Sequence, residues 1–252
     1  MSVVALYVPG SRPDRFAKAA ATGATVILDL EDSVAAADKE TARTAVATWV
    51  GTYDGQAQVR VNAPGSADLA ADLAALPSAT EIRLPKVSAA TDLAPVRGRR
   101  VHVILESAAG VENAALIATE PEVVTLALGE ADLAAELGLD GEDAFGWIRS
   151  RIVVAAAAAG LEPPMMSAYP GVRDLSGLEE SCHRGRRLGM RGRTAVHPGQ
   201  VPVIRSVFTP SAAEVAWANE VLEVLRSDGV ATLPDGSMVD AAMARRARRI
   251  VG

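Results

Sequence analysis

The sequence contains a single cysteine, few aromatic residues and no excess of basic charge. Because Cys182 has no second cysteine to pair with, an intrachain disulfide is excluded, and we interpret it as a packing residue rather than a nucleophile. Phe, Trp and Tyr make up only 4% of the 252 residues, although 49% are hydrophobic. Ala, Val, Leu and Ile must therefore fill the interior, and small side chains let helices pack closely against a sheet.

The net charge limits which partners the protein binds. Its formal value is −6 at pH 7. Proteins that bind nucleic acid or anionic membranes instead carry a basic face. We expect neither partner. The last helix-like segment has four arginines, Arg245, Arg246, Arg248 and Arg249. We interpret them as cations that oppose a helix dipole, with phosphate binding as the alternative.

Long hydrophobic runs are also missing. The longest candidate, IVVAAAAAGL at residues 152–161, is much shorter than the roughly 20 residues that span a bilayer. The N-terminus shows no basic segment followed by a long apolar run, which a signal peptide would need. These features predict a soluble, cytoplasmic protein without a membrane partner.

A repeated pattern does run through the chain: a short apolar run, a polar corner, then an Ala-rich amphipathic segment. Apolar strands that alternate with helices indicate a parallel sheet covered by those helices. Eight strands are predicted, at residues 3–8, 25–30, 58–62, 81–85, 101–105, 123–128, 164–168 and 194–196. Helices are predicted at residues 15–22, 38–49, 66–75, 89–94, 109–119, 142–159 and 175–188. Eight alternating units predict a single (β/α)₈ TIM barrel of the α/β class.

The predicted barrel occupies residues 1–208, and residues 209–252 remain as a C-terminal helical extension. Two helices are predicted there, at residues 212–227 and 238–250, joined by the Gly/Pro/Asp-rich turn SDGVATLPDGSM. Since the barrel does not need these helices, we expect an arm that packs on the barrel or on a neighbouring subunit.

Active sites of such barrels lie at the carboxyl ends of the strands. The polar residues predicted to converge there are Asp29, Glu31, Asp32, Arg60, Asn62, Lys86, Glu106, Asp132 and His197. For His197 we favour a hydrogen-bonded histidine that packs under the barrel mouth.

Two of these acids, Glu106 and Asp132, directly follow neighbouring apolar strands. Paired carboxylates without Cys–His spacing suit a hard cation, Mg²⁺ or alternatively Mn²⁺, rather than zinc. The alternative is a structural network in which both acids pair with Arg60 and Lys86.

The segment LDLEDSV carries three acids. If the strand alternates, Asp29 and Glu31 point to one side and Asp32 to the other. At least one acid then orients Arg60 or a metal-bound water, and Lys86 adds electrostatic support. For Asp32, capping of the following helix is an equal alternative, with Ser33 as another cap.

Seven motifs occur in the order YVPGSRPDRFAKA, VILDLEDSV, VRVN, RLPKV, ILESAAG, ALGEADLAAELG and GMRGRTAVHPGQ. Together they closely resemble the citrate lyase beta-subunit-like proteins of the HpcH/HpaI aldolase superfamily. The resemblance implies an Mg²⁺-dependent carbon–carbon lyase or synthase whose metal ligands are Glu106 and Asp132. It implies that Arg60 grips the substrate carboxylate, and that Arg15 and Lys18 contact coenzyme A.

The resemblance extends to DGSMVDAAM, where it implies a catalytic Asp240 placed in a neighbouring subunit's site. A homotrimer, or a multiple of one, would follow. The implied substrates are hydroxyacyl-CoA esters of malyl-CoA, citramalyl-CoA or citryl-CoA type, which are cleaved to, or formed from, a 2-keto acid and an acyl-CoA.

Other functions remain open at this point. One is a pyruvate aldolase of class II that needs no coenzyme A. Another is an acyl-CoA thioesterase, and a third is a subunit of a citrate lyase complex. A Schiff-base role for Lys86 is disfavoured, because Pro85 at the strand end suits a supporting position better.

Overall fold

The computed structural model describes residues 2–225, 231–233 and 236–251, so parts of the predicted helix 212–227 and of the turn after it lie outside the described residues. The chain divides into two compact units, Met1–Phe208 and Thr209–Gly252.

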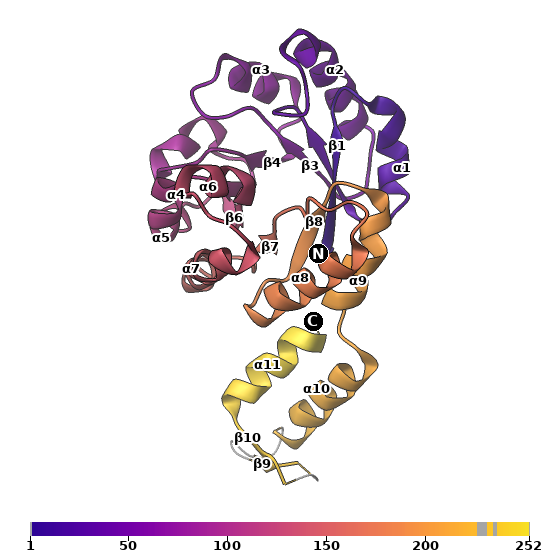
Figure 1. The fold of residues 1–252 in the computed structure, drawn as a ribbon, viewed down its shortest axis with the longest axis vertical. Coiled ribbons are helices and arrows are strands. Elements are labelled where there is room, and N and C mark those ends of the chain that lie inside the picture. The colour runs from indigo at the N-terminus through magenta and orange to yellow at the C-terminus, as the bar shows by residue number, and fades with distance from the viewer. Residues whose placement is uncertain (1, 226–230, 234–235, 252) are drawn as a thin grey trace. The chain divides into compact units, whose positions relative to one another are not determined.

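The first unit is a closed barrel of eight parallel strands in sequence order, which confirms the predicted (β/α)₈ fold. The helices surround the strands (Figure 1). The strands are β1 Val4–Pro9, β2 Thr25–Asp29, β3 Ala57–Arg60, β4 Glu81–Leu84, β5 Val101–Leu105, β6 Val123–Leu128, β7 Met165–Met166 and β8 Gly192–Ala195. β8 closes the barrel on β1, where Leu6 pairs with Ala195.

The strands form where apolar residues are buried on both faces. All residues of β2, β5 and β6 are buried, as expected for a parallel sheet covered by helices. The weakest strand is β7, whose two residues replace the five predicted. Its neighbours still hold it, since Met165 pairs with both Ala127 and Gly192.

The helices of the barrel differ from prediction in their bounds and in their number. The α-helices are α1 Phe16–Ala20, α2 Lys39–Val50, α3 Ala67–Ala75, α4 Ala108–Glu112, α5 Ala114–Ile117, α6 Glu130–Leu137, α7 Gly146–Ala158, α8 Leu175–Arg187 and α9 Val201–Phe208. The 3₁₀ turns are η1 Pro13–Arg15, η2 Ala36–Asp38, η3 Ala90–Val96, η4 Glu142–Phe145 and η5 Pro198–Gln200. Of the described helices, none is both long and apolar enough to cross a membrane.

Two helix predictions were wrong in detail, and two helices were missed. The segment 89–94 lies largely in the 3₁₀ turn η3 instead, because Pro95 follows directly and cannot continue an α-helix. The segment 109–119 is divided into α4 and α5 at Asn113. Two helices, α6 and α9, were not predicted, and α6 ends at Gly138 in the left-handed conformation with φ 66°.

The main hydrophobic core lies between the strands and the helices. It contains Val59 of β3 and the residues Ile82 and Leu84 of β4, all with no exposed surface. Alternate strand residues point the other way, into the barrel. Those interior positions include buried polar groups, among them Gln58 and Arg83. The interior is therefore polar as well as apolar, and a cavity extends into it.

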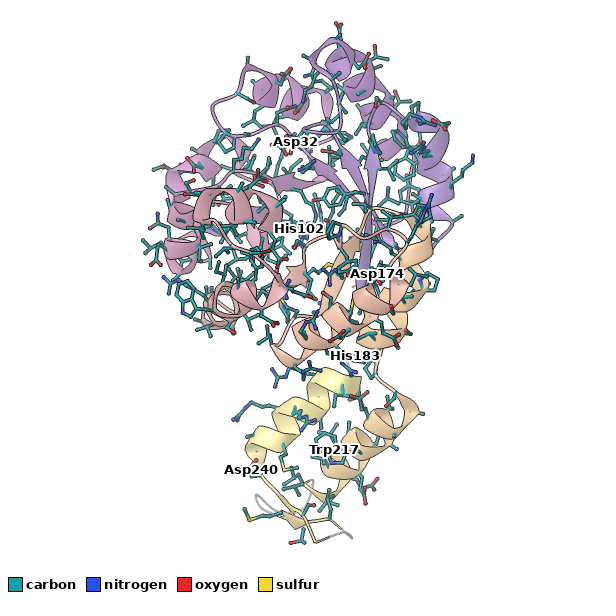
Figure 2. The ribbon with its side chains drawn as sticks, viewed as in Figure 1. Asp32, His102, Asp174, His183, Trp217 and Asp240 are labelled. Carbon is teal, nitrogen blue, oxygen red and sulfur yellow. The ribbon has the colours of Figure 1, made fainter. Side chains whose placement is uncertain are left out.

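The second unit contains α10 Ala212–Val224 and α11 Ala241–Val251, with a short antiparallel ribbon of β9 Ala231–Thr232 and β10 Met238–Val239. The predicted helix start at Met238 was wrong, because Met238 and Val239 pair as a strand. This unit has its own small core of buried residues, namely Ala218, Val221, Leu233, Val239 and Ala247. Asp240 lies at the start of α11 (Figure 2).

Candidate active site

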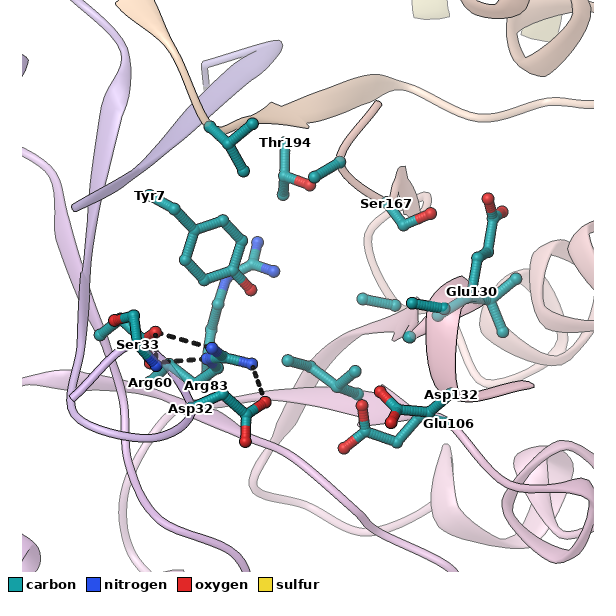
Figure 3. A pocket seen from close by; sticks show the side chains of 18 of the residues that line it. Tyr7, Asp32, Ser33, Arg60, Arg83, Glu106, Glu130, Asp132, Ser167 and Thr194 are labelled. Carbon is teal, nitrogen blue, oxygen red and sulfur yellow. Dashed lines mark hydrogen bonds and ion pairs between the residues drawn. The ribbon is translucent and has the colours of Figure 1, made fainter. Parts of the chain in front are cut away.

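A cavity of about 460 Å³ opens at the carboxyl ends of the strands. Residues from β1 to β8 contribute to its wall, because parallel strands of a closed barrel all end on the same side. The predicted residues that line it are Arg15, Asp29, Asp32, Arg60, Glu106 and Asp132. Figure 3 shows Glu106 and Asp132 next to each other on one wall and Arg60 on the opposite wall.

The Glu106 carboxylate is buried, with 8% of the residue exposed. Burial, together with the negative charges of Glu31 and Asp132, raises the pKa of Glu106 to about 7. Gly129 follows β6 and makes room for this carboxylate, since a Cβ atom on Gly129 would overlap it. The ionised form of Glu106 is therefore unfavourable in this site unless a cation binds to it.

Lys86 supports Glu106 through its backbone. Its N–H donates to Glu106 Oε1 at 2.7 Å. Among the described residues, Lys86 is the only non-glycine with positive φ, 56°. That conformation is strained for a residue with a Cβ atom. The chain therefore holds an unfavourable backbone geometry at the point where the amide contacts the buried carboxylate.

Arg60 is held by acids of the β2 end. Its Nε and Nη2 donate to the two carboxylate oxygens of Asp29, each at 2.7 Å. Burial alone would lower the pKa of Arg60, but the bonds and attraction of Asp29 outweigh it, so that the pKa is raised. Burial would raise the pKa of Asp29, but the contact with Arg60 outweighs it and lowers that pKa. This two-pronged pair is fixed in one geometry.

The third nitrogen of Arg60, Nη1, contacts Glu31 at 2.9 Å and Asp32 at 3.3 Å. Lys86 Nζ lies 3.0 Å from Glu31 as well. The Glu31 oxygens are close to these cations but make no hydrogen bond of good geometry, and burial raises the pKa of Glu31.

Three expectations for the acids at the strand ends are wrong. Because β2 ends at Asp29, strand alternation does not reach Asp32, and Asp29, Glu31 and Asp32 all contact Arg60. The turn η2 begins later and has Ala35 at its N-cap, so neither Asp32 nor Ser33 caps it. A structural network of Glu106 and Asp132 with Arg60 and Lys86 side chains is not formed either, since those two cations pair with the acids of the β2 end.

The remaining predicted residues are spread more widely. Arg15 is exposed and lines the cavity, whereas Lys18 is exposed on α1 and does not line it. His197 accepts a hydrogen bond from the Gly199 N–H at 3.0 Å, but it is exposed, so packing under the barrel mouth was wrong. Asp240 belongs to the second unit, where its Oδ1 accepts the N–H groups of Ala242 and Met243 at the start of α11.

Sequence reasoning missed several polar residues of the cavity wall, namely Ser167, Thr194 and three larger ones. Tyr7 comes from β1, Arg83 from β4 and Glu130 from α6. Glu130 is held by both Nε and Nη2 of Arg149, at 2.7 and 2.8 Å. Arg83 had a visible signal, because it stands between the apolar residues Ile82 and Leu84 of a predicted strand.

The oxygen donors of this site fit a hard divalent cation. Glu106 and Asp132 offer two adjacent carboxylates, and no group of three or more His, Cys, Asp or Glu suited to a metal exists in the described part of the chain. Mg²⁺ is commonly held by one or two carboxylates and keeps several waters. Two protein ligands, one of them a buried carboxylate with a raised pKa, match that preference.

The fold and the cavity define this protein as a (β/α)₈-barrel enzyme with paired carboxylates and an arginine at the strand ends. Residues 4–198 match the HpcH/HpaI aldolase/citrate lyase family, and the chain belongs to this family of carbon–carbon lyases. The resemblance seen in the seven motifs is thereby confirmed.

Individual relatives cover nearly the whole chain. A citrate lyase subunit beta-like protein of Mycobacterium tuberculosis is 37% identical over 256 residues, covering 98% of this chain and 93% of the relative. An L-malyl-CoA/beta-methylmalyl-CoA lyase of Cereibacter sphaeroides is 33% identical, with 98% and 92% covered. A (3S)-malyl-CoA thioesterase of the same species is 35% identical, with 93% and 88% covered.

A solved structure is similar over the same length. It is the M. tuberculosis protein CitE in complex with magnesium, acetoacetate and coenzyme A. It has a TM-score of 0.85 and 34% identity, and the match covers 99% of this chain and 97% of that one.

Proposed function

We propose that this chain is an Mg²⁺-dependent lyase that cleaves, or in reverse forms, a hydroxyacyl-CoA. The products of cleavage are a 2-keto acid and an acyl-CoA. The observation that carries the proposal is the adjacent Glu106–Asp132 pair in a cavity that also contains Arg60. Relatives that are named as malyl-CoA lyase, or solved with magnesium and coenzyme A, support this substrate class.

Glu106 and Asp132 are the proposed metal ligands. Bound there, Mg²⁺ would act as a Lewis acid toward the carbonyl of the keto acid. The Lys86 amide orients the Glu106 carboxylate through its hydrogen bond. Gly129 leaves the room that this carboxylate occupies.

Arg60 is the proposed group that positions the substrate carboxylate. Asp29 holds two of its nitrogens, so the guanidinium is already oriented before a ligand arrives. Nη1 contacts the exposed acid Asp32 at 3.3 Å, and that longer contact is the one a substrate carboxylate would replace. Arg15, at the exposed rim of the cavity, is the proposed contact for coenzyme A, and Lys18 on the outer side of α1 is a more remote candidate.

Asp240 is the proposed catalytic acid–base residue. Its exposed carboxylate uses Oδ1 to cap α11, and no described residue bonds to Oδ2. That oxygen is suited to move the α-proton of a thioester. We propose that Asp240 acts in the site of a neighbouring copy within a homotrimer, or a multiple of one, and that the enzyme is cytoplasmic.

The deciding experiment is a coupled assay for keto-acid release from a panel of hydroxyacyl-CoA esters. The panel contains malyl-CoA, citramalyl-CoA and citryl-CoA, each measured with Mg²⁺ and with EDTA. We expect Mg²⁺-dependent release of glyoxylate, pyruvate or oxaloacetate from at least one ester. Glu106→Gln and Asp132→Asn should each abolish it without unfolding the protein. Turnover that persists in EDTA, or in either variant, would refute the metal assignment.

Mixing two inactive variants tests the position of Asp240. Glu106→Gln lacks a metal ligand and Asp240→Asn lacks the acid–base group, so each is inactive alone. If Asp240 is donated across the interface, a 1:1 mixture after subunit exchange should recover about a quarter of wild-type activity, because mixed rings contain some complete sites. A mixture that exchanges subunits but stays inactive would place Asp240 in its own subunit's site.

Thioester hydrolysis is the second candidate, because one relative is named as a (3S)-malyl-CoA thioesterase. The products separate the two reactions. A lyase releases a keto acid and keeps the thioester, whereas a thioesterase releases a free hydroxy acid and coenzyme A. Detection of free thiol without keto acid would favour hydrolysis.

A further inference from the structure

Arg83 is a buried cation on the cavity wall that the proposed mechanism does not use. It lies in β4 with 2% of its surface exposed, and it lines the cavity. Its guanidinium carbon is 6.0 Å from the centre of the Tyr7 ring. Figure 3 shows the two side chains near each other, with Glu106 and Asp132 across the cavity.

The charge of Arg83 is not neutralised by the protein. Its Nε donates to Gln58 Oε1 at 2.7 Å, which is an uncharged partner. Within the described part of the chain, no carboxylate forms an ion pair with it. Arg60, at the paired position of β3, has three acids around it instead. A buried charge without a counter-ion is unfavourable unless a ligand supplies one.

The two terminal nitrogens of Arg83 face the cavity. Neither bonds to a described residue, and neither is among the polar atoms that are buried without a partner. They must therefore touch the open space of the cavity rather than packed protein. A planar guanidinium that presents two N–H groups in this way matches a carboxylate.

The strand register separates Arg83 from the proposed metal ligands. Arg83 pairs with His102 of β5, and Glu106 follows four residues later. At a strand rise near 3.3 Å per residue, Glu106 lies about 13 Å further along the direction of β5 than His102, the residue that pairs with Arg83. Arg83 therefore faces the cavity at a point separate from the Glu106–Asp132 pair and next to Arg60, which occupies the paired position of β3.

Building on the proposed lyase function, we propose that Arg83 determines specificity by binding a second carboxylate on the keto-acid unit of the substrate. The preferred thioesters are then those that release a dicarboxylic keto acid rather than pyruvate or glyoxylate. A site built around a buried charge discriminates strongly against a ligand that lacks the matching group, because the charge then remains unpaired.

Binding of malate and lactate in the presence of Mg²⁺ tests Arg83 without any turnover. Both ligands carry the same 2-hydroxycarboxylate, and only malate has a second carboxylate. Isothermal titration calorimetry gives the ratio of the two Kd values. We expect wild-type protein to prefer malate by about tenfold or more, which is about 1.4 kcal/mol. In Arg83→Met the ratio should fall toward one.

Arg97→Met is the matched control, because Arg97 is exposed and does not line the cavity. It removes the same charge and should keep the wild-type ratio. Arg83→Gln, which retains a polar group beside Gln58, gives the same readout if the methionine variant is unstable. Equal affinity of wild-type protein for the two ligands, or a preference for malate that survives in the Arg83 variants, would overturn the proposal.

The two proposals fail in different ways. If malate binding depends on Arg83 but no thioester releases a keto acid, the lyase assignment fails and the Arg83 assignment stands. If esters that release pyruvate or glyoxylate are the best substrates and Arg83→Gln leaves that preference unchanged, the Arg83 assignment fails and the lyase stands.

Discussion

Replacing Glu106 by glutamine should stabilise the metal-free protein and abolish its response to Mg²⁺. The pKa of the buried Glu106 carboxyl is raised from 4.5 to about 7. At 1.36 kcal/mol per pKa unit, this shift corresponds to about 3 kcal/mol. The folded state binds the proton more tightly than the unfolded chain, so this stabilisation is fully present below pH 4.5 and is lost as the pH rises to about 7.

Glutamine is uncharged at every pH and has nearly the same shape as protonated glutamate. Its amide oxygen can still accept the Lys86 N–H. In EDTA at pH 8, we therefore expect Glu106→Gln to be more stable than wild type by up to about 3 kcal/mol. For a chain of this size, that is an increase in Tm of roughly 5–10 °C. Near pH 4.5 the difference should disappear.

Addition of Mg²⁺ should cancel most of this difference. At a concentration of about 100 Kd, binding stabilises the wild type by about 2.7 kcal/mol, whereas the variant should gain little. Thermal unfolding followed by circular dichroism, in EDTA and in Mg²⁺ at several pH values, measures both effects. Glu112→Gln is the control, because 67% of the Glu112 side chain is exposed. A Glu106→Gln protein that is less stable than wild type in EDTA at pH 8, or that gains as much from Mg²⁺, would refute this reasoning.

Three further predictions test neighbouring features. Gly129→Ala places a methyl group against the Glu106 carboxylate, so Mg²⁺ affinity measured by thermal-shift titration should fall by about tenfold or more, near 1.4 kcal/mol; an unchanged affinity contradicts this. Lys86→Gly should be about 1 kcal/mol more stable than Lys86→Ala in urea unfolding, because only glycine adopts φ 56° without strain; equal stabilities would show that the backbone is relaxed. Asp240→Asn keeps a side-chain cap on α11 and should retain its stability while losing activity by about 10² or more; Asp240→Ala should lose about 1 kcal/mol as well, and an active Asp240→Asn protein would show that the residue is only a cap.

The strand ends could be predicted from the sequence because each strand is a short apolar run with a polar residue after it. β5 ends at Leu105 directly before Glu106, and β6 ends at Leu128 shortly before Asp132. Because these strands are buried on both faces, their apolar residues are consecutive in the sequence, and the position where each strand ends is easy to locate. The two helices that were missed are short, eight residues each, and packing against the barrel stabilises them more than their own sequence does.

The partners of the charged residues could not be predicted in the same way. LDLEDSV indicated that some acid would orient Arg60, but the two-pronged contact with Asp29 depends on the register of β2 and β3. Arg83 was overlooked because a charge inside a strand could face either the helices or the barrel interior. Its interior position follows from the pairing of β4 with its neighbours.

The amino-acid sequence by itself determined the repeating strand–helix order, the barrel class and the residues that end its strands, since these depend on local patterns of apolar and polar side chains. Only the tertiary structure decided that Glu106 is buried beside Glu31, that Lys86 takes a left-handed conformation and that Arg83 has no acidic partner. The physical reason is that burial, charge separation and backbone strain arise when distant segments close into one barrel, and none of them exists in a strand or helix alone.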